Sequence, residues 1–135
     1  MATQIFVNLP VKDLNKSVEF FTKLGYTFNP QFTDDNATSM IVSDTIFVML
    51  LVEKYFQSFT QKDIVDTSKA LESIICLSAD SKEAVDDMIN KAVAAGGKES
   101  GETQDHGWMY GRGFDDLDGH HWESVWMDPA GFPQQ

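Results

Sequence analysis

Two segments of the chain show the same order of apolar patterns. Between Ile5 and Val11 every second residue is aliphatic, which is the period of a β-strand with one buried face. Asp13 can then cap a helix, and apolar residues recur at helical spacing until Gly25 supplies a stop. Three β-rich stretches follow, near residues 26–32, 38–42 and 45–51. The first segment therefore predicts the order β, α, β, β, β.

The second segment repeats this order. Residues 71–77 are rich in strand-forming side chains, and Asp80 with Glu83 forms a capping box before an amphipathic helix that ends at Gly96 and Gly97. The last strands are expected near residues 98–103, 108–114 and 121–126. This duplication predicts an α+β fold of two tandem βαβββ modules that form a mixed sheet.

The 135 residues suit one domain, and we expect a single domain over residues 1–135. Within it we place module one at about residues 3–52, a linker at 53–69, module two at 70–128 and a C-terminal tail at 129–135. In the linker, Tyr55, Phe56 and Phe59 can lie on one side of a short helix. These aromatic residues either plug the core or a dimer contact, or form a lid over a pocket.

Charge narrows the choice of partners. Ten Lys and Arg against 21 Asp and Glu give a net charge of −11, which repels nucleic acid and anionic lipid surfaces. The acidity favours a cationic ligand or simply keeps the surface hydrated. The longest apolar run, Ile46 to Val52, is too short to span a membrane, so we expect a cytoplasmic protein. Cys76 is the only cysteine and is expected to be a small core side chain.

Two motifs carry a family resemblance. Residues 11–25 fit V-x-D-L-x-x-S-x-x-F-F-x-x-L-G, and residues 116–123 fit D-x-D-G-x-x-x-E. Together with the duplication they resemble the vicinal oxygen chelate superfamily, the group of glyoxalase I, the extradiol dioxygenases and the bleomycin and fosfomycin resistance proteins. Residues 6–11 and 105–112 resemble its branch labelled predicted lactoylglutathione lyase. The resemblance implies a glyoxalase-like fold in which the sheet is cupped around a small-molecule cleft, and a homodimer.

The resemblance also allows a test for a metal. In the metal-dependent relatives, four inward side chains from the first and last strands of each module hold a divalent ion. The matching positions here are Phe6, Ser73, about Met49, and Glu123, of which only Glu123 is an ordinary ligand. We therefore expect no metal cofactor. A divalent metal held by Glu123 with His121 is the alternative.

The hairpin between the last two strands is expected to have its turn centred between Leu117 and Asp118, which predicts how these strands pair. That register places Arg112 opposite Glu123, where the guanidinium can neutralise the carboxylate in place of an ion. It also places Phe114 opposite His121, Tyr110 opposite Val125 and Trp108 opposite Met127.

We expect a cleft lined by residues that alternate with the helix-facing rows. These residues are Phe6, Asn8, Phe47, Met49, Ser73, Ile75, Tyr110, Arg112, His121 and Glu123. Trp108 is a further ligand-binding candidate, although it can equally be a packing residue, and His106 can reach the cleft or remain near a turn.

Three functions fit these residues. The first is a metal-free protein that binds a small, possibly cationic molecule. The alternative is a lactoylglutathione lyase of glyoxalase I type, with Glu123 as base or ligand and Arg112 or Tyr110 as electrophile. The third is an interaction protein with a vestigial cleft. An extradiol dioxygenase is disfavoured, because its iron needs two histidines and a carboxylate on one face.

Overall fold

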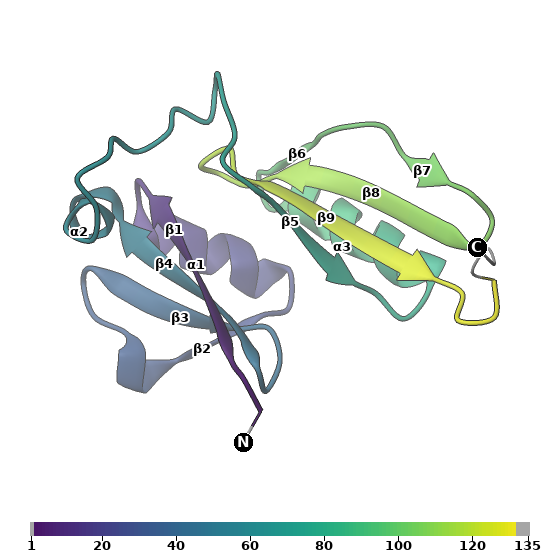
Figure 1. Cartoon of the computed structure of the whole chain (residues 1–135), viewed down its shortest axis with the longest axis horizontal. Coiled ribbons are helices and arrows are strands. Elements are labelled where there is room, and N and C mark those ends of the chain that lie inside the picture. The colour runs from purple at the N-terminus through teal and green to yellow at the C-terminus, as the bar shows by residue number, and fades with distance from the viewer. Residues whose placement is uncertain (1, 132–135) are drawn as a thin grey trace. The chain divides into compact units, whose positions relative to one another are not determined.

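The computed structural model describes residues 2–131, so part of the expected tail at 129–135 lies outside the described residues. The chain divides into two compact units, residues 1–65 and 66–135. Figure 1 shows that each unit contains its own sheet and long helix. No helix in the described part is both long and apolar enough to cross a membrane.

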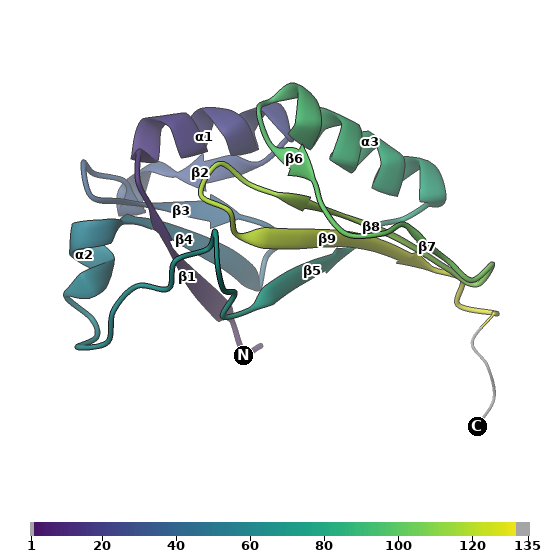
Figure 2. The same ribbon diagram turned by 90° about the horizontal axis from the view of Figure 1, so that it is seen from above.

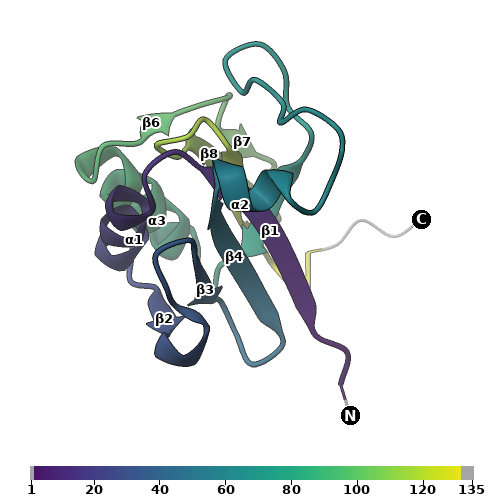
Figure 3. The same ribbon diagram turned by 90° about the vertical axis from the view of Figure 1, so that its left-hand side faces the viewer.

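The first unit is a four-stranded mixed sheet in the order β1-β4-β3-β2, with β1 and β4 parallel and the other neighbours antiparallel. Its elements are β1 (Ile5–Val11), α1 (Leu14–Lys23), β2 (Thr27–Asn29), the 3-10 helix η1 (Pro30–Phe32), β3 (Ala37–Ile41), β4 (Ile46–Val52) and α2 (Glu53–Gln57). Figure 3 shows β1, β4 and β3 side by side, with α2 next to β1. The short helix expected in the linker is therefore confirmed as α2.

The second unit repeats the arrangement with five strands. Its elements are β5 (Ile74–Ser78), α3 (Lys82–Ala94), β6 (Lys98–Glu99), β7 (Gln104–Asp105), β8 (Met109–Asp115) and β9 (His121–Met127). The order is β5-β9-β8-β6, β7 also pairs with β8, and β5 runs parallel to β9. The expected α+β class and the repeated βαβββ order are confirmed. The short strand β7 has no counterpart in the prediction.

Each helix covers one face of its own sheet, as Figure 2 shows for α1 and α3. In the first unit Leu9 and Val11 of β1 and the alternate residues Val48 and Leu50 of β4 are buried with Phe20 and Phe21 of α1, whereas Ile5 at the start of β1 is exposed. In the second unit the buried residues include Val85, Ile89 and Ala92 of α3, together with Phe114 and Trp122 of the sheet. Burial of these aliphatic and aromatic side chains is the main favourable term for each unit.

The cap of α1 is confirmed and the predicted cap of α3 is wrong by one residue. The Asp13 side chain accepts a hydrogen bond from the Lys16 N–H. For α3 the N-cap is Ser81, whose Oγ accepts from the Ala84 N–H, and Asp80 lies outside the helix. Two adjacent residues that can both cap leave the sequence pattern undecided, and the backbone conformation selects one.

Moving the cap by one residue also changes β5. The strand begins at Ile74, so Ser73 precedes it and Ile74 takes the place that corresponds to Phe6. Ile75 and Leu77 are less exposed than Ile74, Cys76 and Ser78, which alternate with them on the other face. Cys76 is exposed, so its prediction as a core thiol is wrong. Partial burial, and then the nearby Glu123 carboxylate, raise the pKa of this thiol.

Candidate functional site

The β8–β9 hairpin differs from the predicted register by one residue. Gly113 lies opposite Glu123, Arg112 lies opposite Ser124, and Asp115 lies opposite His121. The expected pairs of Phe114 with His121, Tyr110 with Val125 and Trp108 with Met127 are wrong for the same reason. Phe114 lies opposite Trp122, Tyr110 opposite Trp126, and Met109 opposite Met127.

The buried Asp116 carboxylate is the physical cause of this register. Its Oδ1 accepts hydrogen bonds from the Asp118 and His120 N–H groups, and its Oδ2 accepts from Nε1–H of Trp122. Gly119 adopts φ +80° within the same turn. The loop is therefore centred on Asp118 rather than between Leu117 and Asp118. Burial raises the pKa of Asp116 despite its hydrogen bonds.

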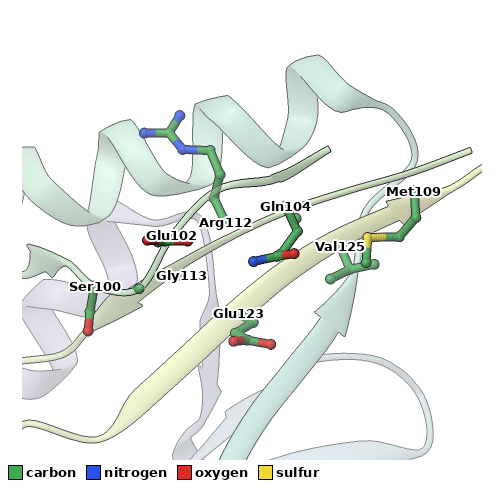
Figure 4. Close-up of a pocket in the computed structure, with 10 residues that line it drawn as sticks. Ser100, Glu102, Gln104, Met109, Arg112, Gly113, Glu123 and Val125 are labelled. Carbon is green, nitrogen blue, oxygen red and sulfur yellow. The ribbon is translucent and has the colours of Figure 1, made fainter. Parts of the chain in front are cut away.

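A shift of one residue moves side chains to the opposite face of a sheet. Arg112 therefore faces α3, where Nη1 lies 2.8 Å from Asp86 Oδ1 and Nη2 lies 2.9 Å from Glu99 Oε2. Tyr110 also faces this side, and its hydroxyl donates to Asp86 Oδ1 at 2.6 Å. Figure 4 shows the Arg112 guanidinium directed toward the helix, away from Glu123. The predicted pairing of Arg112 with Glu123 is wrong.

Glu123 has a histidine as its neighbour instead. His121 Nε2 lies 3.3 Å from Glu123 Oε2, and His121 Nδ1 lies 2.9 Å from Asp115 Oδ1. The His121 side chain is 10% exposed and lies between the two carboxylates. The structure thus brings together His121 and Glu123, which the sequence analysis paired as possible ligands.

A polar pocket with a volume of about 170 Å³ lies over this face of the second unit. Gly111 and Gly113 have no side chains, so their backbone forms part of the pocket wall. Gln104 lies opposite Gly111, and its side chain is on the same face of the sheet as Glu123 (Figure 4). The lining residues are Ser100, Gly101, Glu102, Gln104, Met109, Gly111, Arg112, Gly113, Glu123 and Val125. The pocket is rich in hydrogen-bond acceptors, and the charged end of its single arginine is engaged on the other side of the sheet.

A second pocket, with a volume of about 310 Å³, belongs to the first unit. Its lining includes Asn8 and Met49, which are opposite each other in the β1–β4 pair. The lining residues are Asn8, Gln31, Phe32, Thr33, Asp34, Ala37, Met49, Leu51, Tyr55 and Phe59. The expected Phe6 and Phe47 stack with ring centroids 5.2 Å apart and are not among the lining residues.

The remaining candidate residues are outside both pockets. Ser73 is exposed before β5, and Ile75 is on the opposite face of β5 from Cys76, so neither lines the expected cleft. Trp108 precedes β8, with its ring 6.5 Å from that of His106. Sequence reasoning missed Phe32 and Asp34, because a turn signal says nothing about which way its side chains point. It named Tyr55 and Phe59 without assigning them to a pocket.

The residues at the positions implied for a metal do not fit a divalent ion. Phe6, Met49 and Ile74 supply two hydrocarbon side chains and a thioether, and Glu123 is the one hard oxygen donor. Between residues 2 and 131, no three His, Cys, Asp or Glu side chains gather as a metal site.

Comparison with known proteins finds one family model and several solved structures that are similar to this chain. A family model described as bleomycin resistance protein-like N-terminal matches residues 3–43. A hypothetical protein, SA1046 from S. aureus, is 33% identical, with 93% of this chain and 94% of that chain covered and a TM-score of 0.77. No curated protein matches the sequence.

Two more distant structures share the fold. One is a glyoxalase/bleomycin resistance protein/dioxygenase family enzyme from Burkholderia phytofirmans PsJN, at 14% identity, 93% and 99% coverage and a TM-score of 0.78. The other is a lactoylglutathione lyase from Agrobacterium tumefaciens, at 15% identity, 98% coverage of both chains and a TM-score of 0.68. At such identities the likeness concerns the fold alone.

Proposed function

The chain belongs to the vicinal oxygen chelate superfamily, and from this premise we propose that it binds a small organic molecule without a metal ion. The observation that carries the proposal is the set of side chains at the implied ligand positions. Phe6, Met49 and Ile74 leave Glu123 as the one ordinary ligand among these four positions. One carboxylate cannot repay the dehydration of a hard divalent cation.

The first-unit pocket supplies the binding site in this proposal. It combines an apolar floor, which includes Met49 and Leu51, with a few polar side chains such as Asn8 and Asp34. This combination is the usual composition of a small-molecule site. The ligand is expected to displace water from the apolar floor and to form its directional contacts with the polar side chains.

Lactoylglutathione lyase activity is the weaker candidate. Proton abstraction by Glu123 would need an electrophile to stabilise the enediolate. The two proposed electrophiles, Arg112 and Tyr110, are bonded to Asp86 on the opposite face of the sheet. Turnover of the methylglyoxal–glutathione hemithioacetal, lost in Glu123→Gln, would revive this candidate.

A thermal-shift screen of metal-stripped protein against varied small metabolites and drugs tests the proposal. A ligand present at 100 times its Kd is expected to stabilise the protein by about 2.7 kcal/mol. Asn8→Leu removes a polar group from the pocket and should weaken binding, whereas Val93→Ala, on the exposed side of α3, should leave it unchanged. Ligand binding that requires an added divalent ion would contradict the proposal.

We also propose that the protein is a homodimer, as the resemblance implies. We further propose that it is cytoplasmic, as expected from the sequence. Sedimentation equilibrium over a range of protein concentrations tests the dimer. A monomer at all concentrations would remove that part of the proposal and leave ligand binding to be judged by the screen.

A further inference from the structure

Four aromatic side chains are exposed among the described residues of the first unit. One of them, Phe6, is 51% exposed and stacks on Phe47. Phe32 is 60% exposed, Tyr55 is 40% exposed and Phe59 is 68% exposed. In the same unit Phe20 and Phe21 are almost completely buried, so the core has room for large aromatic rings. Leaving an aromatic ring in water forgoes the free energy of its burial, and exposed apolar groups that gather in one place mark interaction sites.

Three of the exposed rings, Phe32, Tyr55 and Phe59, line the same pocket, whereas Phe6 is not among its lining residues. Phe32 ends η1, Tyr55 lies in α2, and Phe59 follows α2, so two segments far apart in the sequence supply them. The Tyr55 and Phe59 rings meet edge to face, with centroids 5.1 Å apart at 75°. Aromatic rings prefer offset-stacked or edge-to-face contact, and the exposed faces of these rings are available for such contact with a flat aromatic ligand.

The polar part of the pocket carries a negative charge without a partner. Asp34 Oδ1 accepts hydrogen bonds from the Asn36 and Ala37 N–H groups at 2.7 and 3.0 Å, which fixes the carboxylate in position. Oδ2 has no hydrogen-bond partner among residues 2–131, and the pocket lining contains no Lys, Arg or His. A ligand cation can therefore meet Asp34 and also the faces of the aromatic rings.

We infer that this pocket binds a flat aromatic ligand carrying a positively charged amine, an inference that rests on the proposed function. The aromatic part fits among Phe32, Tyr55 and Phe59, and the amine is directed to Asp34. The volume of about 310 Å³ can accommodate a small bicyclic amine.

Three probes of similar size test the inference on the full chain. Tryptamine has both the ring and the charge, indole-3-propionate has the ring with the opposite charge, and 2-cyclohexylethylamine has the charge with a saturated ring. Titrations followed by amide NMR shifts should give the tightest binding for tryptamine, about tenfold or more over either other probe. The shifted amides should belong to residues around the pocket.

Matched variants separate the two parts of the inference. Asp34→Asn keeps the oxygen that holds the turn but removes the charge, and should weaken tryptamine binding about tenfold. Asp35→Asn changes the net charge equally but is not among the lining residues, and should leave binding unchanged. Phe59→Ala should weaken both indole probes, with Val93→Ala as the control for an exposed apolar truncation.

The outcomes distinguish this inference from the proposal beneath it. Equal binding of 2-cyclohexylethylamine would overturn the aromatic part, and tighter binding of indole-3-propionate would overturn the charged part. If none of the three probes binds but another molecule from the screen shifts the pocket amides, the inference fails and the proposed function stands. If no molecule binds in the pocket, both fail.

Discussion

Asp86 is a surface carboxylate that organises two side chains of β8. It accepts hydrogen bonds from the Tyr110 hydroxyl and from Arg112, and these bonds lower the pKa of Asp86. The hydrogen bond to Asp86, and then burial, raise the pKa of Tyr110. The contribution of Asp86 to stability is lost as pH falls through its lowered pKa, and that of Tyr110 is lost as pH rises through its raised pKa.

Asp86→Asn should bring the Tyr110 pKa down toward its ordinary value of about 10. The charge that favours the protonated phenol is removed, while Arg112 keeps its ion pair with Glu99. NMR titration of the Tyr110 ring measures the change. Asp87→Asn is the matched control, because Asp87 pairs with Lys91 instead. A Tyr110 pKa unchanged by Asp86→Asn would contradict the hydrogen bond.

Gly113 allows His121 to lie close to β8. A Cβ at this position would be 2.8 Å from both His121 Cε1 and the Ser100 carbonyl oxygen. Gly113→Ala should therefore destabilise the protein by about 1–3 kcal/mol and displace the His121 ring from Glu123. Urea unfolding and the His121 ring NMR signals measure both effects. Full stability with unshifted signals would show that the close approach is absent.

The sequence identified Glu123 and its neighbour on the same strand, His121, but not which residue of β8 lies opposite Glu123. The alternation in the last strand put Glu123 and His121 on one face, and the structure agrees. Arg112 was assigned to the wrong face because its position depended on the centre of a turn, which the Asp116 side chain moves by half a residue. A side-chain hydrogen bond of this kind leaves no periodic signal in the sequence.

At the scale of elements, periodicity predicted more. Both long helices, and the order of the main strands along the chain, follow from the spacing of apolar residues, because each element must bury one face. Segment ends were less predictable: residues 26–32 divide into β2 and η1, and residues 98–103 yield only the short strand β6. Short edge strands are defined by pairing with a neighbour rather than by their own composition.

The N-cap of α3 gives a direct test at this scale. Ser81→Ala removes the oxygen that accepts from the Ala84 N–H and should cost about 1 kcal/mol of unfolding free energy. Asp80→Ala, one residue earlier, should cost clearly less. Urea denaturation of both variants at neutral pH provides the comparison. A larger loss for Asp80→Ala would restore the capping box expected from the sequence.

For the whole molecule, the distribution of charge is uneven. Fourteen of the Asp and Glu residues and five of the Lys and Arg residues lie after residue 65, while the first 65 residues contain seven and five. Most of the net charge of −11 therefore belongs to the second unit. In the inferred binding of a cationic ligand, the attraction comes from the local carboxylate of Asp34 in the first-unit pocket more than from a general negative field.

Added NaCl should raise the thermal unfolding temperature. Salt screens the mutual repulsion of the acidic side chains, whereas the few exposed ion pairs that it weakens contribute little. Calorimetric scans between about 0.01 and 0.5 M NaCl, at neutral pH, measure the trend. A fall in the unfolding temperature would mean that ion pairs outweigh repulsion.

In each unit the first strand pairs with the last: β1 with β4, and β5 with β9. A growing polypeptide that has just produced β5 must therefore synthesise α3, β6, β7 and β8 before the partner of β5 exists. Until then the edge of β5, with the exposed Ile74 and Cys76, is available to other strands. Ribosome-bound chains stalled before β9 should accordingly be more prone to aggregation and chaperone capture than chains stalled after it.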